Sequence, residues 1–245
     1  MVLPSAAQLL EMWEGAIVAS PTRRALDMLS VAHPELAFDA LAAMPIGQRD
    51  AMLMRLRECL FGSSISLVAA CPKCSQQLES DLLVSDISAV NYVPPEETQI
   101  IDSGGYRVAF RLPTSVDLLS FPSVIDAPRA RDTLLARCVL DARNTENEQV
   151  ACTALPEQVL LAVAEQMSLA DPHADLELAF ECPACGHGWE SMFDIASFLW
   201  RELHAWAQRT LREIHYLARA YGWRESDVLE LSPTRRQVYL ELCRQ

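Results

Sequence analysis

Apolar residues recur at helical spacing through the first 62 residues of the chain. This spacing predicts helices over 5–18 and 47–60. Between them, Ser20-Pro21 is typical of a helix start, because serine can cap free N–H groups and proline there loses no hydrogen bond. The helix over 47–60 is expected to turn its leucines inward and its arginines outward, namely Arg49, Arg55 and Arg57.

The pattern changes to alternation after Gly62. Short alternating stretches predict strands that flank two cysteine pairs. A further hairpin is expected around the turn at Asp102-Ser103-Gly104-Gly105. The predicted strands are 64–69, 77–83, 98–101, 106–112, 174–181 and 189–193.

Helical periodicity returns from Thr114 to about Met167, with a polar loop at 142–149. The clearest helix is predicted over 195–221, where Leu199, Leu203 and Leu217 belong to an apolar stripe that extends to Tyr221. Gly222 is a typical residue to end this helix. Shorter helices are expected over 225–231 and from Ser232 onward.

These elements predict an α+β fold that is mainly helical, with a long C-terminal helix. The expected organisation is a split four-cysteine zinc ribbon with an inserted β-hairpin and helices. The predicted regions are an N-terminal helical region 1–62, a split ribbon 63–193 with knuckles 63–83 and 174–193 and an insert 84–173, and a C-terminal helical region 194–245.

Composition narrows the class of protein. The chain has 245 residues, of which 51% are hydrophobic and 22% charged, which excludes global disorder. Its net charge of -13 opposes nonspecific nucleic-acid binding, which needs basic residues. Apolar runs are too short for a membrane span, so we expect no membrane contact. Glu11 and Glu14 stand where a signal peptide would be apolar, which argues against secretion by that route.

Two pairs of cysteines carry the strongest chemical signal in the sequence. Cys71-Pro-Lys-Cys74 and Cys182-Pro-Ala-Cys185 are each followed, at the same offsets, by an apolar residue and Glu-Ser. Two such turns present four thiolates in the number that a structural zinc ion prefers. We therefore predict one Zn²⁺ bound by Cys71, Cys74, Cys182 and Cys185. A redox Cys-x-x-Cys is the alternative, although that motif needs a helix after the first cysteine; unliganded thiols are a second alternative.

The two pairs are more than a hundred residues apart, much further than in an ordinary zinc ribbon. Closing such a loop costs roughly 4 kcal/mol, whereas structural zinc supplies on the order of 10–16 kcal/mol. The metal would therefore act as a clamp on the insert. We expect Cys182→Ser to unfold or aggregate the protein.

The other candidate residues favour structural roles. His187 is expected to be a turn residue rather than a fifth ligand, and Lys73 either offsets thiolate charge or faces solvent. His204 and His215 are interpreted as packing or partner contacts. The scattered cysteines are expected to be small buried hydrophobes; they are Cys59, Cys138, Cys152 and Cys243. We find no motif for catalysis or for a phosphate loop and expect no enzyme activity and no small-molecule substrate.

Aromatic residues are concentrated in the last 46 residues, and they lie on more than one face of the predicted helices. Most are expected in the core, but tryptophan and tyrosine are also typical of protein interfaces. The segment 192–245 is close to neutral, so the acidity belongs to residues 1–191. Two different partner surfaces are therefore plausible.

The C-terminal run Glu213-Ile-His-Tyr-Leu-Ala-Arg-Ala-Tyr-Gly-Trp223, followed by Arg236-Gln-Val-Tyr-Leu240, resembles the baseplate hub and hub-assembly chaperone family of T-even-type contractile phages. Arg111-Leu-Pro-Thr114 is similar to the family's central segment. The paired knuckles resemble the larger versions from bacterial phage-tail-like contractile injection systems.

This resemblance implies a non-enzymatic assembly chaperone or minor component of a baseplate hub. It would act by binding hub or spike proteins in the bacterial cytoplasm, with or without incorporation into the tail-like particle. The alternative is a zinc-ribbon regulatory protein associated with nucleic acid, which the acidic charge opposes.

Overall fold

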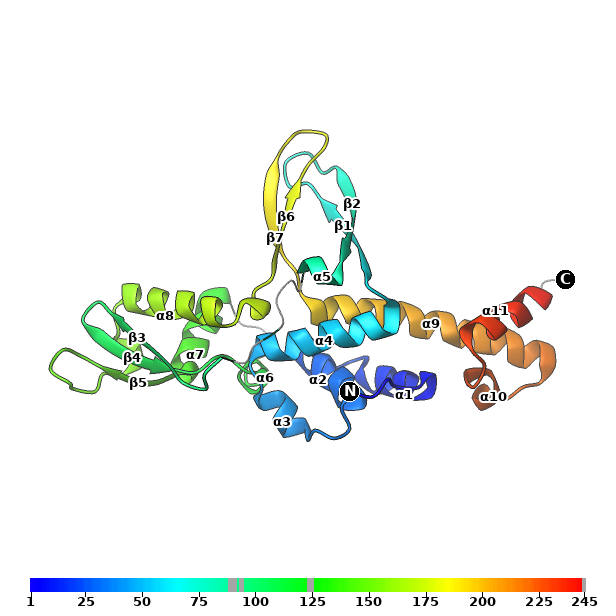
Figure 1. Cartoon of the computed structure of the whole chain (residues 1–245), viewed down its shortest axis with the longest axis horizontal. Helices are drawn as coiled ribbons and strands as arrows, with labels where there is room; N and C mark the ends of the chain where they lie inside the picture. The colour runs from blue at the N-terminus through cyan, green and yellow to red at the C-terminus, as the bar shows by residue number, and fades with distance from the viewer. Residues whose placement is uncertain (88–91, 93–94, 123–125, 244–245) are drawn as a thin grey trace. The chain divides into compact units, whose positions relative to one another are not determined.

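The computed structural model describes residues 1–87, 92, 95–122 and 126–243, and these divide into two compact units (Figure 1). One unit combines residues 1–35 with 196–245, and the other contains residues 36–195. The fold mixes helices with small antiparallel sheets, as the sequence predicts. The units divide the predicted N-terminal region 1–62, because its first 35 residues belong with the C-terminal helices.

The larger unit contains a three-stranded sheet in the order β3-β4-β5, covered by helices α7 and α8. Its core includes Val108 and Phe110 from β4 and Val159 and Val163 from α8, all almost fully buried. The hairpin turn passes through Gly104 and Gly105, both in the left-handed region. The bounds are β3 (Gln99–Ser103), β4 (Tyr106–Phe110), α6 (Ser115–Leu119), α7 (Ala127–Cys138), β5 (Val139–Arg143) and α8 (Glu157–Ala170).

Two further hairpins in this unit lie side by side, with their turns at the same end (Figure 1). Each is a two-stranded antiparallel sheet, and each carries one cysteine pair at its turn. Helix α4 precedes the first hairpin, and Gly62 ends that helix with a positive φ of 90°. The bounds are α3 (Phe38–Ala43), α4 (Ile46–Phe61), β1 (Ser64–Ala70), β2 (Gln77–Leu83), α5 (Val84–Ile87), β6 (Glu177–Glu181) and β7 (Gly188–Met192).

The smaller unit is helical. Its core joins Leu10 of the N-terminal segment to Ala207 and Leu217 of the long helix and to Val228 and Leu240 further on. Ser5, Ser20 and Ser232 cap three of its helices, two of which begin with proline. The bounds are α1 (Ala6–Ala16), α2 (Pro21–Ala32), α9 (Ile195–Tyr221), α10 (Glu225–Leu229) and α11 (Pro233–Leu242).

Several local predictions were wrong. Helix α3 and strand β5 were not expected; β5 lies where the sequence predicts the end of a helical segment and the start of the polar loop at 142–149. Arg49 and Arg57 were placed on the outer face of α4, but they are only 5% and 2% exposed. Tyr221, which the sequence places at the end of the apolar stripe, is 40% exposed. Part of the loop predicted over 84–97 falls outside the described residues, and its start forms the short helix α5.

Within the described residues, no helix is both long enough and apolar enough to cross a membrane.

Candidate metal centre

The two cysteine turns have the same backbone structure. In the first turn, the Cys71 N–H donates to the carbonyl of Gln76 (2.9 Å), and the Ser75 N–H donates to the carbonyl of Cys71 (2.9 Å). The second turn repeats both bonds, from Cys182 to His187 (2.9 Å) and from Gly186 to Cys182 (2.8 Å). The shared sequence pattern therefore specifies one turn geometry, used twice.

The structure brings all four predicted cysteines together. Their Sγ atoms lie within 4.8 Å of one another. The closest approaches are between the two turns: 3.7 Å from Cys71 Sγ to Cys185 Sγ and 3.6 Å from Cys74 Sγ to Cys182 Sγ. Each of these two pairs joins residues more than a hundred positions apart in the chain.

These distances fit a zinc ion. Four sulfurs at a Zn–S distance of about 2.3 Å form a tetrahedron whose sulfurs are about 3.8 Å apart. Cys71 and Cys182, the first cysteine of each turn, are buried, whereas Cys74 and Cys185 are exposed. A closed set of four sulfurs is typical of structural sites, because a catalytic site keeps one position for water or substrate.

The thiols of the cluster differ in acidity. Burial raises the pKa of Cys71, but the backbone N–H groups of Cys74 and Lys73 outweigh it and lower that pKa to about 7. At Cys185 the His187 N–H lowers the pKa, yet burial and the three neighbouring cysteines together raise it to about 12. Without a cation, Cys185 therefore keeps its proton at neutral pH. A bound metal would need the thiolate form of each cysteine, so its affinity would fall as the pH falls.

Residues around the cluster have structural contacts. Lys73 is exposed. The ring of His187 stacks on Trp189, with ring centroids 6.3 Å apart, and Trp189 in turn stacks on Phe180 across the hairpin at 5.4 Å. His187 thus lies beside the turn and has an aromatic neighbour.

The remaining cysteines do not all follow the prediction that they are buried. Cys138 is buried, and burial raises the pKa of its thiol to about 11. Cys152 is half-buried. Cys59 and Cys243 are exposed, so the prediction is wrong for these two.

The histidines that were interpreted as packing residues differ in their surroundings. The Trp13 indole N–H donates to His204 Nδ1 at 3.0 Å, which links α1 to α9. His204 Nε2 lies 2.9 Å from Gln208 Nε2, so both ring nitrogens have neighbours. His215 is exposed, and its ring meets the edge of Tyr216.

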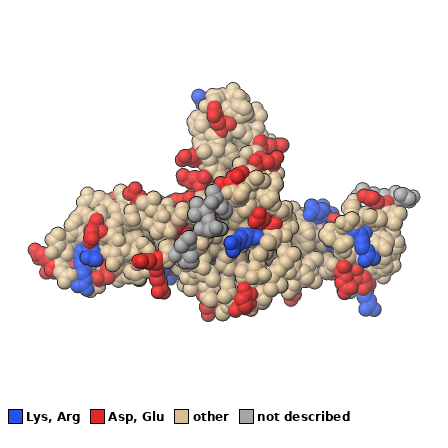
Figure 2. Space-filling view, viewed as in Figure 1, with Lys and Arg blue, Asp and Glu red and all other residues tan. Residues whose placement is uncertain are grey.

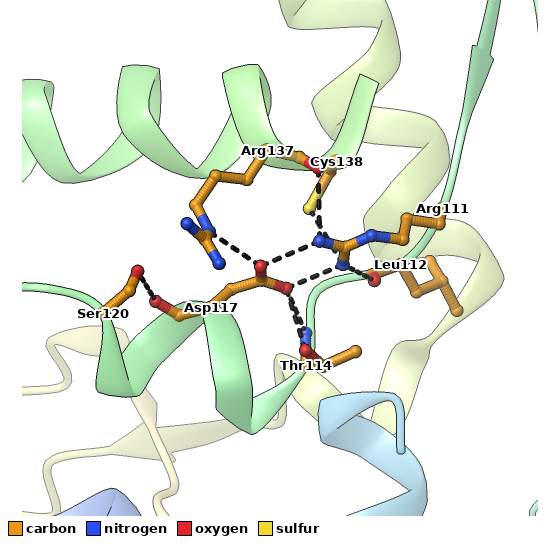
Figure 3. Close-up of polar contacts among 7 residues, drawn as sticks. All are labelled: Arg111, Leu112, Thr114, Asp117, Ser120, Arg137 and Cys138. Carbon is orange, nitrogen blue, oxygen red and sulfur yellow. Dashed lines mark hydrogen bonds and ion pairs between the residues drawn. The ribbon is translucent and has the colours of Figure 1, made fainter. Parts of the chain in front are cut away.

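A second polar centre, which no sequence motif marks, surrounds the buried carboxylate of Asp117 (Figure 3). The carboxylate accepts hydrogen bonds from both terminal nitrogens of Arg111, from Arg137 Nε, and from the backbone N–H and hydroxyl of Thr114, at 2.7–2.9 Å. Burial raises the pKa of Asp117, but these donors outweigh it and hold the pKa well below its usual range.

The Asp117 network joins the end of β4, the start of α6 and the end of α7. Its donors Arg111 and Thr114 belong to the Arg-Leu-Pro-Thr segment singled out in the sequence. Both oxygens of Asp117 already accept hydrogen bonds from other residues of the protein. A buried charge with its partners in place is typical of a structural role rather than a catalytic one.

The fold and the cysteine cluster together define a mixed helix-and-sheet protein with a possible four-sulfur metal site. A family model described as T4 bacteriophage base plate protein matches residues 33–200, roughly two-thirds of the chain, and the chain belongs to this family. The match includes both cysteine turns and Arg111–Thr114, but it ends at residue 200, before the run from Glu213 to Leu240 that carried the resemblance. Neither curated proteins nor solved structures gave a match.

Proposed function

We propose that this chain is a non-enzymatic assembly factor or minor structural component of the baseplate hub of a contractile phage tail-like particle. It would act by binding hub or spike proteins, with one structural Zn²⁺ held by the four cysteines. The observation that carries this proposal is the base plate family match over residues 33–200. The family supports contact with other baseplate proteins, and the hub or spike partner is our inference.

The chemistry of the described residues supports a binding role. The sulfur cluster would leave no open position on its metal. The Asp117 carboxylate is occupied by structural donors, and the His204 ring accepts from Trp13. None of these groups is arranged as a nucleophile beside a base.

Co-expression with the hub and spike proteins of the same host tests the proposal. A tagged copy of this chain should recover one of those proteins at a fixed ratio. Cys182→Ser should lose that partner, whereas Cys59→Ser, which changes an exposed cysteine outside the cluster, should retain it. Recovery of nucleic acid with no tail protein would instead favour the regulatory alternative.

Two measurements refine the assignment. Elemental analysis of the purified protein should find about one zinc per chain. Mass spectrometry of purified particles separates a component, which remains in the particle, from a chaperone that acts in the bacterial cytoplasm and leaves. Zinc-free protein that still binds its partner would contradict the structural role of the metal.

A further inference from the structure

The C-terminal half of α9 carries a basic and aromatic surface on a protein that is otherwise strongly acidic. Arg209, Arg212 and Arg219 are exposed, and among the described residues none of them forms an ion pair. The one acid in this half of the helix, Glu213, is paired with Arg236 of α11 at 3.2 Å. The arginines therefore keep their charge available to an outside group.

A groove adjoins this surface. It encloses about 570 Å³ and is lined by Tyr216, Arg219 and Ala220 of α9 and by Leu240 and Cys243. Arg212, Tyr216 and Arg219 lie on one face of the helix, because they are three or four residues apart. The groove thus suits an apolar side chain that has a carboxylate close beside it.

The outer face of the β6–β7 hairpin presents this combination. Met192 is 69% exposed, and Glu177 lies directly opposite it in the strand register. Glu190 precedes Met192 by two residues, so it projects from the same face about 7 Å away. Glu181 is exposed on this face too, and Figure 2 shows acidic side chains over the two cysteine-bearing hairpins. Met192 is therefore an exposed apolar side chain between two carboxylates.

We propose that the β6–β7 face of one copy of this chain docks on the α9–α11 groove of a second copy. Met192 enters the groove, and Glu177 and Glu190 pair with Arg212 and Arg219 of the other copy. Methionine adapts to irregular apolar hollows, and the paired charges fix its orientation.

The net charge of -13 does not prevent this contact. At physiological salt, charges more than about 8 Å apart are largely screened, so the matched groups at the contact outweigh the distant repulsion. Two different patches meet, so the contact can close as a reciprocal dimer or as a ring. This inference concerns contacts between copies and does not depend on which baseplate protein the chain binds.

Light scattering after size exclusion, and sedimentation, test the proposal on the full chain over a wide range of protein concentration. Wild-type protein should self-associate, and high salt should weaken the association. Arg212→Glu/Arg219→Glu and Glu177→Arg/Glu190→Arg should each lower the association constant by about tenfold or more. An equal mixture of these two variants should associate again, because each supplies the charges that the other has lost.

Two matched controls separate docking from folding. Arg55→Glu/Arg107→Glu reverses two exposed arginines elsewhere and should leave the association unchanged. Met192→Glu should abolish it, whereas Val68→Glu should not; Val68 is equally exposed, at 69%, on the other hairpin. Circular dichroism should show all variants folded. A wild-type protein that stays monomeric, or a mixture that fails to restore association, would overturn the proposal.

Discussion

At the residue scale, the two cysteine turns differ at one backbone position. Ser75 and Gly186 occupy the same place in their turns, with φ values of 59° and 64°. This left-handed conformation costs a residue with a side chain roughly 1–2 kcal/mol, but glycine adopts it readily. The first turn is therefore the strained copy of the second.

Exchanging these residues should change the stability of the metal centre in opposite directions. Ser75→Gly should stabilise the folded site by about 0.5–1 kcal/mol, since the relief of strain is partly offset by the entropy of glycine. Gly186→Ser should destabilise the site by about 1 kcal/mol, because serine disfavours the left-handed backbone conformation. A steric clash does not contribute, since an added Cβ would meet nothing within 4 Å. Zinc competition with a chelator measures both changes, and equal effects of the same sign would contradict the argument.

The Asp117 carboxylate gives a second prediction at this scale. Asp117→Asn should lower the free energy of unfolding by about 2 kcal/mol at neutral pH, because the buried side chain loses its charge while Arg111 and Arg137, which are partly exposed, keep theirs. Asp141→Asn is the control: its ion pair with Arg143 is partly exposed, so the loss should stay below about 1 kcal/mol. Denaturant titration compares them.

The pH dependence follows from the direction of the shift. The pKa of Asp117 is held below its usual value in the folded protein. The stabilisation is therefore complete above about pH 5 and is lost as the pH falls through about 4 and below. The difference between wild type and Asp117→Asn should shrink over this acidic range, and a difference that stays constant would argue against the charge as its cause.

At the element scale, a distant carboxylate sits at the start of α4. The Gly47 N–H donates to Asp171 Oδ2 at 2.8 Å, and Asp171 is only 2% exposed. A Cβ at Gly47 would lie 1.8 Å from Asp171 Oδ1. Glycine is thus required here for the close approach of this carboxylate.

Alanine should therefore have opposite effects in two helices. Gly47→Ala should destabilise the protein by about 1–2 kcal/mol, because it displaces the carboxylate that caps α4. Gly15→Ala in α1 should stabilise by up to about 1 kcal/mol, since alanine favours helix and the site is open. Thermal unfolding of both variants checks this, and a stabilising Gly47→Ala would show that Asp171 relaxes without cost.

Two helices show what sequence periodicity predicts well and what it misses. The helix over 195–221 was predicted with its observed bounds, because its apolar period persists for 27 residues. Arg49 was misplaced because it donates to the hydroxyl of Ser115, which is 66 residues away, and Arg57 was misplaced because it donates to the carbonyl of Gly62 at the end of its own helix. Strand β5 was missed because its partner is β4, more than twenty residues earlier, and its five residues carry little pattern of their own.

The candidate metal site was predictable because its signal is local. Each cysteine turn is a contiguous motif, and the repetition of the motif indicated that the two turns meet. The Asp117 network lacked such a signal, since its arginines stand 6 and 20 residues away and the spacing matches no metal or catalytic motif. The exposed arginines of α9 could be placed on the helix from sequence, but only the coordinates show that no acid among the described residues pairs with Arg209, Arg212 or Arg219.

At the scale of the whole molecule, the sulfur cluster joins two hairpins that are far apart in the chain. A two-stranded hairpin alone is marginally stable in water, and both hairpins here are two-stranded. Closing the intervening loop costs roughly 4 kcal/mol, which zinc binding would exceed severalfold. The paired hairpins should therefore depend on the metal more than on their own packing.

Removal of the metal tests this dependence. A zinc chelator should lower the unfolding temperature and speed hydrogen exchange first in β1–β2 and β6–β7, because these strands lose their shared anchor. Cys182→Ser should expose the same strands and unfold or aggregate, whereas Cys59→Ser should match wild type. Chelated protein could instead keep both its melting temperature and the exchange protection of these hairpins. That result would show that side-chain packing alone stabilises the paired hairpins and that the metal does not clamp them together.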